Sequence, residues 1–300
     1  MKPGRFRRCS GRTWLALVLV GLFLAMAAGA CGPGPAEVST NAGEGQASPP
    51  LLKVHYLDVG QADSILVQFP GGKAVLIDGG NAEDGGRVVR YLQKNGVKKL
   101  TAVVATHPHE DHIGGLGEVL SRLPVGEFYL PRRATTTRTY KNLLATLKEK
   151  GIPVYEAKAG TQIEVGPEAE ATFLGPVRLD YEDLNDASAV LKVKYGRTSF
   201  LFMGDAGEAA EKDLVERGGL KADVLKVGHH GSASASSSAF LKAVRPRLAV
   251  ISVGKDNDYG HPSPQTLRRL RMAGARVLRT DEAGDIVIAS DGEKVGEAKE

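Results

Sequence analysis

The chain has 300 residues, enough for one large domain or two small ones, and its 42% hydrophobic and 25% charged residues are typical of a globular protein. The formal net charge of +4 comes from the first thirty residues, which hold five basic side chains; the rest of the chain has a net charge of about −1. This balance excludes a broadly basic surface for nucleic acid, so any attraction for polyanions must come from a local patch or from bound metal ions.

The first thirty residues have the layout of a secretory signal peptide: a basic start, an apolar run over 14–30, and small residues before Cys31. The sequence Ala28-Gly29-Ala30-Cys31 resembles the bacterial lipobox, in which the cysteine is lipidated. A retained transmembrane anchor is the alternative, since seventeen apolar residues are at the short limit for a membrane span. Either interpretation predicts export, with the rest of the chain held at the cell membrane outside the cytoplasm.

Residues 31–50 are rich in Gly, Pro, Ser and Ala, which predicts a flexible tether. No similar break follows, so 51–293 is expected to form one domain, with a polar tail over 294–300. The other cysteine, Cys9, lies in the signal peptide, so an internal disulfide is excluded.

In chain order, short apolar runs divided by Gly-rich turns predict strands, and apolar residues at helical spacing predict helices. Strands are expected at 53–59, 63–69, 73–78, 100–105, around 128, and at 161–165, 171–174, 187–195, 198–203, 224–227, 248–253 and 285–289. Helices are expected at 84–94, 114–123, 140–150, 208–217, 237–244 and 263–272. Strands and helices mixed through both halves predict an α/β fold of two mixed sheets packed together and covered by helices.

The segment that carries the chemistry follows the apolar strand expected at 100–105. His107, His109, Asp111 and His112 lie within six positions, and three of the seven histidines of the chain are among them. Alternate side chains share a face of an extended segment, so His107 and His109 can converge on one ion. A helix that opens near Asp111 would turn Asp111 and His112 towards a neighbouring position. Imidazole and carboxylate groups ligate zinc, manganese or iron, so the cluster favours a metal site over a polar surface loop.

The pattern HxHxDH after a hydrophobic strand resembles the signature of the metallo-β-lactamase superfamily. Further stretches are similar to its ComEC branch, the DNA-uptake proteins whose C-terminal domain has this fold. They are 57–64 (LDVGQADS), 203–205 (MGD), 225–232 (LKVGHHGS) and 259–262 (YGHP). Their order and spacing agree across 52–290, and the resemblance implies a four-layer αββα sandwich with hydrolase activity.

The resemblance also implies two divalent metal ions, with zinc favoured and manganese as the alternative. A hydroxide held between them would attack a phosphorus or carbonyl centre. The ligands would be His107 and His109 for one ion, Asp111, His112 and His229 for the other, and Asp205 as a bridge. Asp111, beside the hydroxide, would also belong to the catalytic residues.

Several further residues have more than one interpretation. Many members of the superfamily supply another histidine after the first motif, whereas residues 185–188 stand in that place here; Asp186 could ligate instead, or water could. His230 could face the substrate or only pack near the loop. His261 precedes the last expected helix, an anion-binding position, and is assigned to the substrate phosphate or the leaving group in preference to a structural role.

Three aspartates at turns or strand ends are expected to support the ligand loops from behind. They are Asp58, Asp63 and Asp78. His55, in the middle of an expected strand, is expected to be structural.

Two divalent ions suit phosphodiester hydrolysis, because both the attacking and the leaving oxygen can be stabilised. Two basic clusters could each guide a phosphate backbone or be a solvated helix face. They are Arg132, Arg133, Arg138 and Lys141, and Arg245, Arg247, Arg268, Arg269 and Arg271. We therefore expect a metal-dependent phosphodiesterase or nuclease that acts on DNA or another phosphodiester. The alternatives are hydrolysis of a carbon centre, as in a lactone or β-lactam, and a non-catalytic lipoprotein that binds polyanions.

Overall fold

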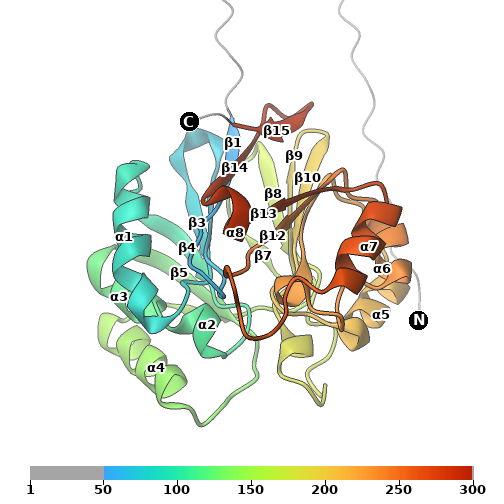
Figure 1. Cartoon of the computed structure of the whole chain (residues 1–300). Coiled ribbons are helices and arrows are strands. Elements are labelled where there is room, and N and C mark those ends of the chain that lie inside the picture. Colours follow the sequence, from blue (N-terminus) through green and yellow to red (C-terminus); the bar gives the residue numbers. More distant parts are fainter. Residues whose placement is uncertain (1–50, 299–300) are drawn as a thin grey trace, which may run out of the picture. The chain divides into compact units, whose positions relative to one another are not determined.

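A computed structural model describes residues 51–298 (Figure 1). The expected signal peptide at 1–30, the expected lipidation site Cys31 and the expected tether at 31–50 lie outside the described residues. Within the described part, no helix is both long enough and apolar enough to cross a membrane.

One sheet holds eight strands, antiparallel at one side and parallel from β3 to β6. In spatial order they are β15 (Val295–Glu297), β14 (Ile286–Ser290), β1 (Leu52–Tyr56), β2 (Ile65–Gln68), β3 (Ala74–Ile77), β4 (Leu100–Val104), β5 (Val125–Leu130) and β6 (Val154–Glu156).

The other sheet holds seven strands and is parallel from β10 to β13. In spatial order they are β13 (Arg276–Arg279), β12 (Leu248–Ile251), β11 (Val224–Lys226), β10 (Thr198–Phe202), β9 (Leu191–Tyr195), β8 (Ala169–Phe173) and β7 (Gln162–Ile163).

Helices cover the outer face of each sheet (Figure 1). Those beside the first sheet are α1 (Gly85–Lys94), α2 (Glu110–Ile113), α3 (Leu116–Arg122) and α4 (Arg138–Lys150). Those beside the second sheet are α5 (Glu208–Arg217), α6 (Ser238–Val244) and α7 (Pro264–Met272). A short helix, α8 (Thr280–Ala283), follows β13, and 3-10 turns lie at Pro70–Gly72, Ala82–Asp84, Asn185–Ala187 and Gly228–Gly231.

Side-chain alternation along the strands divides the core into layers. In β10, Phe200 and Phe202 are buried between the two sheets, and Leu201 is buried against the helices of its own sheet. Successive strand residues point to opposite faces, so a strand covered on both faces must be apolar throughout. Each such side chain contributes about 1.5–3 kcal/mol by leaving water. The layers confirm the predicted αββα sandwich.

The structure differs from the predicted elements mainly at the sheet edges. β6, β13 and β15 were not expected, because their side chains are mostly exposed or half-buried and show no apolar alternation. β15 lies within the expected polar tail at 294–300, where backbone pairing with β14 makes it a strand. The helix expected at 114–123 is preceded by α2, and the strand expected at 187–195 begins only at Leu191.

Candidate metal centre

The candidate ligands follow the ends of strands from both sheets. Asp78 follows β3, His107 follows β4, Asp205 follows β10, and His229 and His230 follow β11. Ligand sites in α/β folds lie beyond the carboxyl ends of parallel strands, because the loops of neighbouring strands converge there. The parallel halves of the two sheets therefore bring distant segments to one site.

The histidine segment changes from strand to helix where the sequence predicts it. His109 is the N-cap of α2, and Asp111 and His112 lie in the single turn that follows. His107 Nε2 is 3.1 Å from His109 Nδ1, so these two imidazoles converge. The segment thus presents two adjacent sets of ligand atoms.

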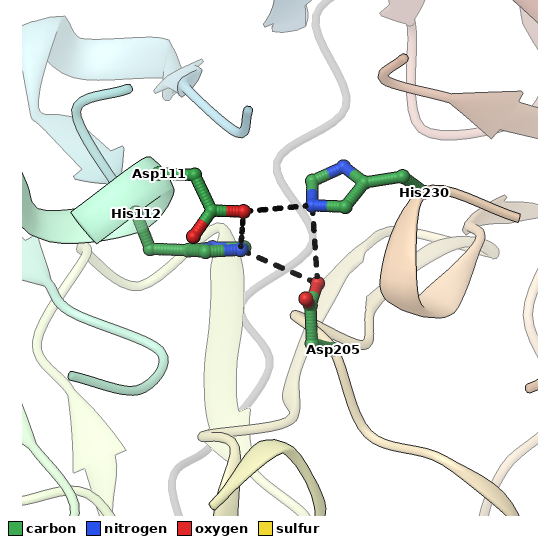
Figure 2. A group of neighbouring side chains, drawn as sticks. All are labelled: Asp111, His112, Asp205 and His230. Atoms are coloured by element: carbon green, nitrogen blue, oxygen red, sulfur yellow. Dashed lines mark ion pairs between the residues drawn. The ribbon is translucent and has the colours of Figure 1, made fainter. Parts of the chain in front are cut away.

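Figure 2 shows a group of possible ligand atoms from Asp111, His112, Asp205 and His230. One atom from each side chain lies within 4.8 Å of the others. His112 Nε2 is 3.3 Å from Asp205 Oδ1 and 3.5 Å from Asp111 Oδ2. His230 Nε2 is 3.6 Å from Asp205 Oδ1 and 3.3 Å from Asp111 Oδ2. Two imidazoles and two carboxylates therefore face a common point.

Asp205 uses its two oxygens on two different sides. Oδ1 faces His112 and His230, whereas Oδ2 is 3.9 Å from His107 Nε2 and 3.7 Å from His229 Nε2. A carboxylate in this position can bridge two cations. The two oxygens of Asp205 therefore face two separate pairs of histidines.

The structure places His229 and His230 differently from the sequence prediction. His229 was expected in the group with Asp111, and His230 was left open between substrate contact and packing; the structure places His230 in that group and His229 near the other oxygen of Asp205. Both have a left-handed backbone, with φ of 49° and 50°. This conformation costs roughly 1–2 kcal/mol per residue that has a Cβ, and here it allows both side chains to reach Asp205.

Polar atoms in the group test whether a metal ion fits. His112 Nε2, Asp205 Oδ1 and His230 Nε2 are buried, and none of them has a hydrogen-bond partner within the described part. The two imidazole nitrogens lie 3.3 and 3.6 Å from Asp205 Oδ1, as ion-pair contacts. A buried polar atom without a partner costs about 1–3 kcal/mol, which an ion would offset. Imidazole and carboxylate together are a donor set for zinc and for manganese. The residues therefore fit a divalent cation.

Burial and neighbouring charges set the protonation of the group. Burial alone would lower the pKa of His112, but the carboxylates of Asp205 and Asp78 hold that pKa well above its usual value. Burial alone would raise the pKa of Asp205, but the imidazoles of His112 and His230 hold it well below. Contacts with the same imidazoles outweigh burial and lower the pKa of Asp111. The ionised forms of Asp111 and Asp205 are thus favoured, and a bound divalent cation would take the place of the protons on the facing imidazoles.

Asp78 holds His112 from behind. His112 Nδ1 is 2.8 Å from Asp78 Oδ2, and Thr106 donates its hydroxyl to the same oxygen at 2.7 Å. The backbone N–H of Thr106 donates to Asp78 Oδ1 at 2.8 Å. With Nδ1 engaged, Nε2 of His112 is directed towards Asp205, which is how such supporting carboxylates orient ligands.

A second support involves Lys226, a residue that the sequence analysis did not single out. Lys226 Nζ lies 2.8 Å from Asp63 Oδ2, and both side chains are almost fully buried. Asp63 Oδ1 is 3.5 Å from His230 Nδ1, which is also 3.0 Å from the backbone oxygen of Ser252. A lysine inside the apolar run 224–227 was the signal in the sequence.

The centre opens into a cavity of about 570 Å³. Its acidic lining residues are Glu83, Glu110, Asp111 and Asp205, and among the residues that the structure describes no Lys or Arg side chain lines it. The other lining residues are Gln61, Asn81, His109, Asn185, His229, His230, Tyr259 and His261. Like charges repel at this range, so an anionic substrate needs cations in the cavity.

In the segment 185–188, which stands where many superfamily members have another histidine, Asn185 and not the expected Asp186 lines the cavity. Asp186 Oδ1 accepts from the backbone N–H groups of Gly207 and Ala210, at 2.9 and 3.2 Å, so Asp186 stabilises the start of α5 and is not placed as a ligand. Asn185 lines the cavity, and its Oδ1 is buried without a hydrogen-bond partner in the described part of the chain.

The remaining candidates lie outside the ligand group. Asp58 accepts from the N–H of Gly60 at 3.3 Å and supports the turn before Gln61, a cavity residue. His55 hydrogen-bonds to Tyr91 and Gln68, which is a structural arrangement.

The two basic clusters do not line the cavity. Arg133 donates to the backbone oxygen of Tyr181, and Arg269 donates to those of Ala235 and Ser236. These two arginines hold loops in place, which favours the structural interpretation for them.

Gly115→Ala is expected to disrupt the ligand segment. A Cβ at this position would lie 2.1 Å from the backbone oxygen of Gly79. Because the clash is with backbone and not with the end of a flexible side chain, the two segments would have to move apart. We expect a loss of about 3 kcal/mol or more in the free energy of unfolding. Gly117→Ala, two residues on in α3, is the control, because its Cβ meets open space and alanine favours a helix by up to about 1 kcal/mol. Urea denaturation compares them, and equal stability of the two variants would contradict the expectation.

Glu211→Ala is expected to loosen the serine-rich loop behind the histidines. The buried carboxylate of Glu211 accepts the backbone N–H groups of Ser236 and Ser237. Leaving these donors unpaired should cost about 1–3 kcal/mol of stability. Burial raises the pKa of Glu211, so its contribution is greatest at acidic pH and declines as the pH rises, and the loss should be larger in acid than at neutral pH. Chemical denaturation at acidic and at neutral pH tests this, with the exposed Glu216→Ala as the control. A Glu211→Ala protein that is as stable as the control at both pH values would contradict the prediction.

A family model described as "Metallo-beta-lactamase superfamily" matches residues 57–255. ComE operon protein 3 of Bacillus subtilis (strain 168) is 32% identical over 252 residues, covering 78% of this chain and 32% of that protein. Competence protein ComA of Neisseria gonorrhoeae is 33% identical over 232 residues, covering 76% of this chain and 30% of that protein. The chain thus spans about a third of the length of these relatives.

Solved structures share the fold at low identity. Igni18, described as a novel metallo hydrolase from Ignicoccus hospitalis, is 18% identical with a TM-score of 0.52, covering 79% of this chain and 98% of that one. CmlA, a diiron beta-hydroxylase from Streptomyces venezuelae, is 17% identical with a TM-score of 0.50, covering 78% of this chain and 53% of that one.

Proposed function

The chain belongs to the metallo-β-lactamase superfamily, in its ComEC-like branch, and we propose that it is a metal-dependent phosphodiesterase or nuclease acting on DNA or another phosphodiester. The superfamily supports a metal-dependent hydrolase. The competence proteins among its relatives support a substrate related to DNA.

The observation that carries the proposal is the division of Asp205 between two histidine pairs. Oδ1 faces His112 and His230, and Oδ2 faces His107 and His229. A pair of divalent ions on the two sides would be arranged as in enzymes that clamp both oxygens of an in-line displacement at phosphorus. Zinc is the first ion to test and manganese the second.

Divalent ions bound here would lower the pKa of a water molecule and neutralise charge that develops on phosphorus. The residues of the chain orient the reaction around them. Asp111 and Asp205 supply the fixed negative charge, and Asp78 and Asp63 hold the imidazoles behind the centre. His261, which lines the cavity, would give a proton to the leaving oxygen.

The test is hydrolysis by the purified chain after metal removal and reloading. We expect cleavage of single- or double-stranded DNA, or of a chromogenic phosphodiester, with zinc or manganese and not with chelator. A β-lactam and a lactone are assayed in parallel. A protein that binds two ions and hydrolyses only the lactone or β-lactam would overturn the phosphodiester assignment and leave the metallo-hydrolase in place.

We also propose that the enzyme is exported and anchored to the cell membrane through lipid on Cys31. The N-terminal sequence supports this proposal. Cys31→Ser is expected to move the protein from the membrane fraction to the soluble fraction, measured by immunoblotting after membrane separation. Cys9→Ser, in the expected signal peptide, is the control. A Cys31→Ser protein that stays in the membrane fraction would favour a transmembrane anchor.

A further inference from the structure

Tyr259 is an unusually exposed aromatic side chain at the metal cavity. It is 73% exposed, and it lines the cavity that holds the candidate ligands. Large aromatic surfaces dominate contact energies when they are covered, so an exposed ring beside a site is suited to bind a flat partner.

Aromatic rings connect Tyr259 to the centre in short steps. The Tyr259 ring stacks on His261, with centroids 5.8 Å apart and planes at 26°. His261 meets His229 edge to face at 5.7 Å, and His229 Nε2 is 3.7 Å from Asp205 Oδ2. Two ring-to-ring steps of less than 6 Å each therefore separate the exposed ring from a candidate ligand.

The side chain of Asn257 makes several hydrogen bonds within the loop that carries these rings. Asn257 Oδ1 accepts the backbone N–H groups of Tyr259 and His261 at 3.2 and 3.0 Å. Its Nδ2 donates to the backbone oxygens of Gly254 and His261 at 2.9 and 2.6 Å. The ring is thus placed before any partner binds, which lowers the entropy lost on binding.

We propose that Tyr259, stacked on His261, is a platform for one unpaired nucleobase beside the metal centre, and that the substrate is single-stranded nucleic acid. This inference rests on the proposed function, because the phosphate next to that base would lie at the metal ions. Within the part of the chain that the structure describes, no lysine or arginine lines the cavity to hold further phosphates, so stacking on Tyr259 would supply a contact to the polymer that does not depend on its charge. Every base has a π-face that an aromatic ring can stack on, whereas a duplex keeps its bases covered.

The experiment measures equilibrium binding, so that it does not depend on hydrolysis. The metal-loaded chain is titrated into fluorescent oligodeoxyadenylate with cleavage-resistant phosphorothioate links, and into an abasic strand with the same backbone. We expect the base-bearing strand to bind about 10-fold more tightly, and Tyr259→Leu to remove that preference. Tyr259→Phe should keep it, because the ring remains. Tyr155→Leu is the matched control, since Tyr155 is an exposed tyrosine (46%) on β6 outside the cavity.

Equal binding of the two strands by the unchanged protein would overturn the platform, as would a preference that survives in Tyr259→Leu. Failure of the platform and failure of the proposed function give different results. Hydrolysis of base-bearing and abasic strands at the same rate would remove the platform and keep the phosphodiesterase. A base preference that depends on Tyr259, in a protein that hydrolyses no phosphodiester, would keep the platform and remove the proposed activity.

Discussion

Asp205→Asn is expected to lower phosphodiester hydrolysis by about 100- to 1000-fold and to leave fewer than two metal ions per chain. The physical reason is the use of both carboxylate oxygens, one towards His112 and His230 and the other towards His107 and His229. An amide of the same shape offers one oxygen and one NH₂ group, and it carries no charge. It can therefore serve one cation at most.

Metal content by mass spectrometry and initial rates with saturating zinc or manganese measure the two effects. The thermal shift on adding metal is a third readout, because a ligand that binds only the folded chain raises its stability. Asp180→Asn is the control, since Asp180 is an exposed carboxylate whose pairing with Arg178 contributes little. An Asp205→Asn protein with two bound ions and an unchanged rate would remove Asp205 from the centre.

Lys226→Met is expected to lower the free energy of unfolding by about 3–5 kcal/mol. Lys226 Nζ pairs with Asp63 Oδ2 at 2.8 Å in a region with almost no solvent contact. Methionine fills a similar volume but leaves the carboxylate buried without its cation. The other carboxylate oxygen of Asp63 has no hydrogen-bond partner within the described part, and the neighbour printed beside it is the His230 imidazole at 3.5 Å.

The double variant Lys226→Met/Asp63→Asn is the sharpest control, because removing both charges should restore much of the lost stability. Chemical denaturation of the single and double variants gives the coupling energy. If the Lys226→Met protein were as stable as the unchanged protein, Lys226 and Asp63 would not form a buried ion pair. The same preparations can be assayed for metal affinity, which we expect to fall because Asp63 lies against His230.

The cavity makes substrate binding conditional on metal. Among the described residues its lining has four carboxylates and no lysine or arginine, and the imidazoles of His229 and His230 lie against carboxylates. An anion would enter only after cations reverse the local charge.

The fold class and the main candidate metal-binding segment could be predicted from the sequence alone. The apolar strands are buried on both faces, so their pattern was visible without tertiary contacts, and His107, His109, Asp111 and His112 are close in space because they are close in the chain. Edge strands such as β6 and β13 were not visible, since backbone pairing makes them strands.

Tertiary contacts determine which of two adjacent histidines faces the centre and which residues from distant parts of the chain support it. Whether His229 or His230 faces Asp111 depends on the left-handed backbone at both positions, which residue type does not predict for histidine. Likewise, Lys226 acquires its role from Asp63, 163 positions earlier, and Tyr259 from its place at the cavity. Contacts between strands of different sheets bring these groups together, and no local pattern in the chain encodes such contacts.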